Sequence, residues 1–203
     1  MKGKLLWIGL AVFLLSLGQL RADWATDLLG PTLVNANGKS IPLATALGNK
    51  RLIGLYFSAH WCGPCRGFTP KLVKFYNDCR KYRKSLEIVF ISSDTSRHDM
   101  KGYMRGMNMP WSAVPYDEKK LASIRRKYQV GGIPKLVILD QFGRVVSKDG
   151  RWDVVLLAEK AYDSWLAPNY RQLTYDDYLR QNPLPPASKL SKEKKSHSKK
   201  KKK

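Results

Sequence analysis

The sequence has few cysteines and few acidic residues. Three cysteines in 203 residues are too few for the disulfide framework of a small secreted scaffold. Only 16 acidic residues accompany 37 lysines and arginines, so the formal net charge is +21 at pH 7. No apolar run reaches the ~20 residues that favour a membrane-spanning helix. We therefore expect one well-buried basic domain with tails, because the chain is too short for two ordinary domains.

The first residues have the three-part layout of a secretory signal peptide. A basic start, Met1–Lys4, precedes fourteen residues without a charge, Leu5–Gly18. Ala22 is the predicted last residue before cleavage, and an uncleaved membrane anchor is the alternative. We expect residues 1–22 to export the domain from the cytosol, to a periplasm, to the ER lumen or out of the cell.

The other end of the chain is a separate basic segment. Nine lysines and one glutamate lie between Lys189 and Lys203. Such a highly charged sequence with few apolar residues predicts disorder. We therefore expect a folded domain over residues 23–167 and a disordered lysine-rich tail over residues 168–203.

Two cysteines stand where a strand gives way to a helix. Cys62 and Cys65 lie between the predicted buried strand Leu52–Phe57 and the predicted helix Phe68–Lys84. Two thiols at this spacing can close a small ring. The free N–H groups and positive dipole end of a helix start favour a thiolate, which is the reactive form of cysteine.

A zinc site is the alternative interpretation of this cysteine pair. Zinc needs two further ligands at suitable spacing. The only other candidate zinc ligands in the sequence are Cys79 and three scattered histidines, at positions 60, 98 and 197. We therefore expect no metal, and we expect Cys79 to be a buried apolar residue.

The residues around the pair resemble a known superfamily. Trp61 to Cys65 read WCGPC, the active-site motif of thioredoxins, and the longer string YFSAHWCGPCRGFTPKLVKFY resembles the tryparedoxin and nucleoredoxin branch more closely. That branch commonly has Pro-Pro between the cysteines, whereas this chain has Gly63-Pro64. The resemblance covers about residues 25–167. It implies an α/β fold, a three-layer sandwich with a central mixed sheet and flanking helices.

The pattern of apolar and turn residues predicts the other elements. Two short strands flank an Asn37-Gly38 turn. Further strands are expected at 86–91, 135–139 and 144–146, and helices at 97–106, 117–128 and 152–166. Residues 108–116 are expected to form a loop.

The resemblance also implies roles around the cysteine pair. Cys62 would attack a target disulfide and Cys65 would resolve the mixed disulfide. Trp61, Gly63 and Pro64 would shape the site. The asymmetry between the thiols predicts an exposed Cys62 and a buried Cys65.

A second landmark follows from the same resemblance. Thioredoxin-like proteins place a cis proline opposite the cysteine pair, and Pro134 is at this position. The backbone of Ile133 would then be free to pair with an extended substrate peptide. Where thioredoxins keep a buried acid for proton transfer, this chain has Tyr56.

The expected function is that of a monomeric thiol-disulfide oxidoreductase. Its substrates would be protein or small-molecule disulfides, with an unknown electron donor or acceptor. It would need no cofactor beyond the Cys62–Cys65 dithiol-disulfide pair. The alternative is a non-catalytic binding protein on the same scaffold, whose lysine tail holds anionic surfaces or nucleic acid by charge.

Overall fold

The computed structural model describes residues 24–183. The chain divides into two compact units, Met1–Gln172 and Leu173–Lys203. The predicted leader at residues 1–22 and the lysines from Lys189 onward lie outside the described residues. Within residues 24–183, no helix is both long enough and apolar enough to span a membrane.

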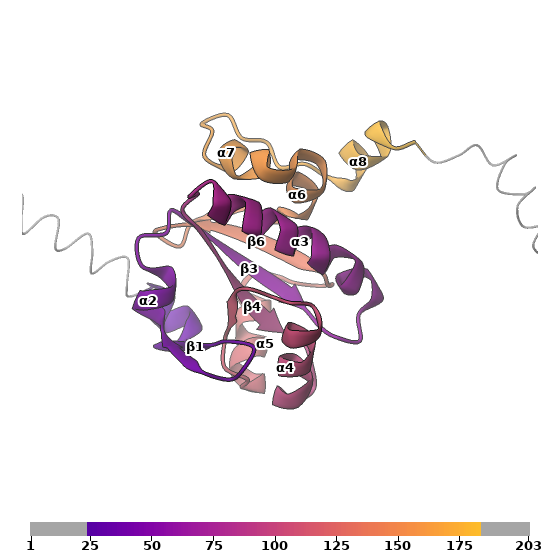
Figure 1. Cartoon of the computed structure of the whole chain (residues 1–203). Coiled ribbons are helices and arrows are strands. Elements are labelled where there is room, and N and C mark those ends of the chain that lie inside the picture. Colours follow the sequence, from indigo (N-terminus) through magenta and orange to yellow (C-terminus); the bar gives the residue numbers. More distant parts are fainter. Residues whose placement is uncertain (1–23, 184–203) are drawn as a thin grey trace, which may run out of the picture. The chain divides into compact units, whose positions relative to one another are not determined.

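A mixed sheet forms the centre of the first unit (Figure 1). Its strand order is β2-β1-β5-β4-β3-β6-β7. The central strand β3 pairs parallel with β4 and antiparallel with β6. The strands are β1 (Thr32–Val34), β2 (Ser40–Pro42), β3 (Leu52–Ser58), β4 (Leu86–Ser92), β5 (Ser112–Ala113), β6 (Lys135–Asp140) and β7 (Val145–Ser147).

Successive side chains of β3 point to opposite faces of the sheet. Both sets are buried, because helices cover both faces. Tyr56 faces the layer built with α3, α4, α6 and α7, whereas Phe57 faces the layer built with residues 24–29, α2 and α5. The helices are α2 (Leu43–Leu47), α3 (Gly63–Lys81), α4 (Arg97–Gly106), α5 (Glu118–Lys127), α6 (Arg151–Leu157) and α7 (Ala161–Trp165). The predicted α/β sandwich is confirmed.

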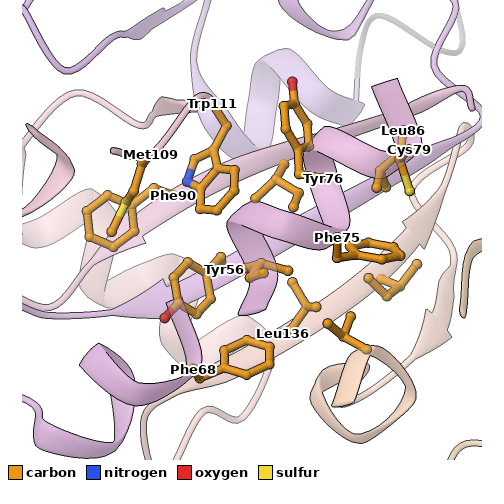
Figure 2. Close-up of a cluster of buried hydrophobic side chains, with 14 of the residues drawn as sticks. Tyr56, Phe68, Phe75, Tyr76, Cys79, Leu86, Phe90, Met109, Trp111 and Leu136 are labelled. Atoms are coloured by element: carbon orange, nitrogen blue, oxygen red, sulfur yellow. The ribbon is translucent and has the colours of Figure 1, made fainter. Parts of the chain in front are cut away.

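Aromatic side chains fill the layer under α3 (Figure 2). The Tyr56 ring makes edge contacts with Phe68 and Trp111, at centroid distances of 5.8 and 6.2 Å. Trp111 makes a further edge contact with Tyr76, at 5.5 Å. Edge-to-face pairs of this kind add stability beyond the burial of their area. They fix α3, and with it the cysteine pair, on the sheet.

Two predicted elements differ from the structure. The expected loop at residues 108–116 contains the short strand β5, which pairs with β4 and β1. Two residues are too few to produce a sequence pattern. The single helix expected at 152–166 is interrupted by a 3-10 turn, Ala158–Lys160, where Ala158 has a φ of 49°.

The end of the folded region also differs from the expected boundary at residue 167. Tyr170 donates a hydrogen bond of 2.7 Å to the buried Asp153 carboxylate. Gln172 accepts hydrogen bonds from Ser147 and from the backbone of residues 148 and 149. The first unit therefore extends to Gln172. The second unit contains helix α8 (Tyr175–Gln181), capped by Thr174, in a range for which the sequence predicts disorder.

Candidate functional site

The cysteine pair lies at the carboxyl end of the central strand. β3 ends at Ser58 and α3 begins at Gly63, with Cys62 as its N-cap. Cys62 and Cys65 form a disulfide with an S–S distance of 2.08 Å. The Cys65 backbone N–H donates to Cys62 Sγ at 3.2 Å. The predicted position at a strand-to-helix junction is confirmed.

The two sulfurs differ less in burial than the sequence predicts. Cys65 is fully buried, but Cys62 is only 6% exposed in the disulfide form. The prediction of an exposed Cys62 is therefore wrong for this form, because Ala59 and Ile133 pack against the pair. Trp61 is 59% exposed, and its indole N–H donates to the Ser93 carbonyl at 3.3 Å.

The loop before β6 completes the surroundings of Cys62. The Ile133–Pro134 peptide bond is cis, as the resemblance implies. The Ile133 carbonyl oxygen lies 3.7 Å from Cys62 Sγ. On the other side, Gly63 and Pro64 are exposed in the first turn of α3. The structure thus brings together all seven site residues that the sequence indicates.

Hydroxyl groups surround the backbone of Cys65. Thr69 Oγ1 donates to the Cys65 carbonyl at 2.8 Å and lies 2.8 Å from the hydroxyls of both Tyr56 and Tyr103. The Tyr103 hydroxyl is also 3.0 Å from Ser58 Oγ. Burial raises the pKa of Tyr56 above its ordinary value, so this phenol stays neutral. A neutral network therefore occupies the place of the buried acid of thioredoxins.

A histidine and a buried carboxylate stand next to the pair. His60 donates its backbone N–H to Asp94 Oδ1 at 2.8 Å, and its ring Nδ1 lies 2.7 Å from the same oxygen. Ser92 Oγ donates to the other oxygen at 2.7 Å. The sequence predicts capping residues for α4 among positions 94–96, and the N-cap is Ser96. The parallel pairing of β3 and β4, which places Ser58 opposite Ser92, could have indicated the contact.

The third cysteine takes no part in this site. Cys79 is 1% exposed in the aromatic layer, as expected (Figure 2). Burial raises the pKa of its thiol to about 12. Among residues 24–183 there is no group of three or more side chains that could hold a metal ion.

Comparison with known proteins identifies relatives of this chain. A family model described as Thioredoxin-like matches residues 49–145. Nucleoredoxin of Bos taurus is 40% identical over 130 residues, which cover 64% of this chain and 29% of the relative. The chain thus spans less than a third of the length of that relative.

Solved structures give the same result. Tryparedoxin I from Crithidia fasciculata is 33% identical, with a TM-score of 0.59, and the match covers 66% of this chain and 92% of that one. Thioredoxin from Wuchereria bancrofti is 38% identical, with a TM-score of 0.58 and coverage of 68% and 96%.

These relatives correct the predicted localisation. Nucleoredoxins from animals and a plant match the chain, and they are intracellular proteins. This finding contradicts export from the cytosol, and with it the predictions of a signal peptide, a periplasmic location and secretion. The apolar run Leu5–Gly18 that suggested export lies outside the described residues.

The fold, the disulfide at the start of α3 and these similarities agree with one another. Nucleoredoxins and tryparedoxins are redox enzymes, and this chain holds a cysteine pair at disulfide distance within the residues that the family model matches. The chain belongs to the thioredoxin superfamily, in its nucleoredoxin and tryparedoxin branch.

Proposed function

We propose that this protein is a thiol-disulfide oxidoreductase that acts on protein or small-molecule disulfides through Cys62 and Cys65. The observation that carries the proposal is the disulfide between these residues at the first turn of α3. Membership of a family of redox proteins supports it. The alternative, a binding protein acting through its lysine tail, concerns residues 189–203, which lie outside the described residues.

In the reducing direction the proposed reaction has two steps. The Cys62 thiolate attacks one sulfur of the substrate disulfide and forms a mixed disulfide, and the first substrate thiolate leaves and takes up a proton. Cys65 then loses its proton and attacks Cys62 Sγ, which releases the second substrate thiolate. Two electrons pass from the pair to the substrate. A dithiol donor must return them before the next cycle.

The first step is assigned to Cys62 because of its position. Cys62 precedes the helix, and the Cys65 N–H that points at its sulfur can stabilise the negative charge of a thiolate. Cys65 has no exposed surface, whereas Cys62 has a small exposed fraction of 6%. A substrate sulfur would therefore meet Cys62 first.

The residues beside Cys62 would hold the substrate. The Ile133 carbonyl, 3.7 Å from the sulfur, can accept a backbone hydrogen bond from an extended substrate segment. Trp61 offers an exposed aromatic surface next to it. The space beside Gly63 is open to a substrate, because a Cβ at this position would meet no atom of another segment within 4 Å. Pro64 is exposed in the same turn of α3.

Insulin reduction tests the proposal directly. With dithiothreitol as the dithiol donor, the protein should accelerate insulin reduction, and both Cys62→Ser and Cys65→Ser should abolish the acceleration. Cys79→Ser is the matched control, since it removes a thiol that lies outside the site, and it should keep most of the rate. A wild-type rate no faster than dithiothreitol alone contradicts the proposed function.

A further inference from the structure

A pocket of about 240 Å³ opens between the start of α3 and helix α4 (both labelled in Figure 1). His60 and Arg66, which flank the motif in the chain, line it together with His98, Asp99, Gly102 and Gly106 of α4. Sites for whole small molecules typically measure ~300–1,000 Å³. The pocket is therefore suited to one group of a larger substrate.

Two glycines make the hollow in α4. Gly102 and Gly106 are four residues apart, so they lie on the same face of the helix. A Cβ placed on either one would meet no heavy atom within 4 Å. The space is therefore open, and larger side chains at these positions would reduce it without a clash at Cβ.

Two of the side chains that line this pocket, Arg66 and His98, can donate hydrogen bonds. In the described part of the chain, the Arg66 guanidinium and the His98 ring have no hydrogen-bond or ion-pair partner. Arg66 alone carries five N–H donors in a planar fork. Arg66 follows Cys65 in the first turn of α3, so this wall of the pocket belongs to the segment that carries the cysteine pair. A ligand group for this pocket must therefore accept hydrogen bonds.

The acidic residue of the pocket already has partners. Asp99 accepts a 2.6 Å hydrogen bond from the Ser96 hydroxyl, which lowers the pKa of its carboxyl group. Asp99 therefore stays ionised at neutral pH at the start of α4, where the helix dipole favours a negative charge. It does not neutralise Arg66, because no ion pair joins the two residues. A second anion in the pocket would be held by Arg66 and weakly repelled by Asp99.

We propose that this pocket binds the carboxylate of an acidic side chain that lies beside the target disulfide of a protein or peptide substrate. The inference rests on the proposed function and adds a substrate preference to it. Arg66 would hold the carboxylate through paired N–H donors, a geometry that arginine provides and lysine does not. His98 and the outer nitrogen of His60 would complete the wall.

Two matched peptides test the proposal. Each contains one intramolecular disulfide, and they differ only in having Glu or Gln next to one cysteine. The measured quantity is the second-order rate constant with which the reduced protein reduces each peptide at low ionic strength. We expect the Glu peptide to react about three- to tenfold faster, the scale of one partly exposed charge-assisted contact. The preference should fall at high salt.

Four variants test whether the preference for the Glu peptide depends on this pocket. Arg66→Gln should abolish the preference, so that the ratio of the rate constants for the Glu and Gln peptides falls to about one. Arg97→Gln is the matched control, because it removes an exposed arginine at the start of α4 that does not line the pocket. Gly102→Leu should also abolish the preference, and it should not weaken the fold because leucine favours a helix more than glycine does. Asp99→Asn should increase the preference.

The outcomes separate this inference from the proposed function. Reduction of both peptides at equal rates by the wild type contradicts the subsite and leaves the oxidoreductase intact. An equal loss of preference in Arg97→Gln and Arg66→Gln shows diffuse attraction by net charge, which also contradicts the subsite. No reaction with either peptide overturns the proposed function, and the subsite inference falls with it.

Discussion

The hydroxyls of Tyr56 and Thr69 lie 2.8 Å apart beside the backbone of Cys65. The single proton of Thr69 Oγ1 goes to the Cys65 carbonyl, so the nearby phenols of Tyr56 and Tyr103 must donate to Thr69. The direction of three hydrogen bonds is thereby fixed. They hold the second cysteine through its carbonyl, without a buried charge.

Thr69→Val should destabilise the fold by about 1–3 kcal/mol. Valine has nearly the shape of threonine, but it removes the hydroxyl that accepts hydrogen bonds from two buried phenols and donates one to the Cys65 carbonyl. The free energy of unfolding in urea measures the effect. Ser123→Ala removes a hydroxyl that is exposed on α5 and should change stability by no more than about 0.5 kcal/mol. Equal effects for the two variants would show that the network adds no stability.

Asp94→Ala should weaken both the fold and the exchange reaction. The buried carboxylate holds His60 through two contacts and Ser92 through one, so its loss should cost about 2–3 kcal/mol. Insulin reduction should slow on the order of tenfold, because Cys62 follows the segment that Asp94 anchors. Asp78→Ala is the control. It breaks a surface pair with Lys74 and should cost no more than about 1 kcal/mol and no activity.

The parts of the site that could be predicted carry local signals. The WCGPC motif with its flanking strand and helix places Cys62 and Cys65, and the resemblance places the cis bond before Pro134. The contact of His60 with Asp94 depends on the pairing of β3 with β4, and no local pattern encodes it. The hollow at Gly102 depends on how α4 lies against α3, which spacing alone does not reveal.

In the fold, too, elements with a strong local sequence pattern could be predicted, and elements without one could not. Long apolar strands such as Leu52–Ser58 are predicted within one residue, because buried strands have a strong pattern. Strand β5 exists through its pairing with β4, a tertiary contact that no local pattern encodes. No local pattern marks the break near Ala158 either, where the backbone has a φ of 49°.

Stability should fall as the pH rises above about 9. Burial raises the pKa of Cys79 from its ordinary 9.0 to about 12, so the folded chain keeps a proton that the unfolded chain releases. The contribution is complete below pH 9 and is lost between pH 9 and 12. Urea unfolding of the oxidised wild type and Cys79→Ala proteins at pH 8, 9 and 10 measures it as the difference between their slopes. Buried tyrosines with a raised pKa add to both slopes, so the part that belongs to Cys79 is at most about 1.4 kcal/mol per pH unit. Cys79→Ala should make the curve less steep from pH 9 to 10, and an unchanged slope would contradict this assignment.

Removal of Lys189–Lys203 should weaken binding to anionic surfaces but leave the rate of disulfide reduction nearly unchanged. The truncated chain loses nine lysines and should elute from an anionic resin at a markedly lower salt concentration. Its rate of insulin reduction should stay within about twofold of the full chain, because electrostatic steering of a protein substrate falls at physiological salt. If the truncated protein instead reduced small disulfides far more slowly than the full chain, the tail would be part of the catalytic machinery.

Trapping of mixed disulfides tests the central claim most directly. Reduced Cys65→Ser and Cys62→Ser proteins, each mixed with oxidised insulin and then quenched with acid, are compared by intact mass for the covalent adduct. Cys62 attacks and Cys65 releases, so Cys65→Ser should accumulate the adduct while Cys62→Ser yields almost none. An equal or greater yield of adduct from Cys62→Ser would contradict the assignment of the two thiols.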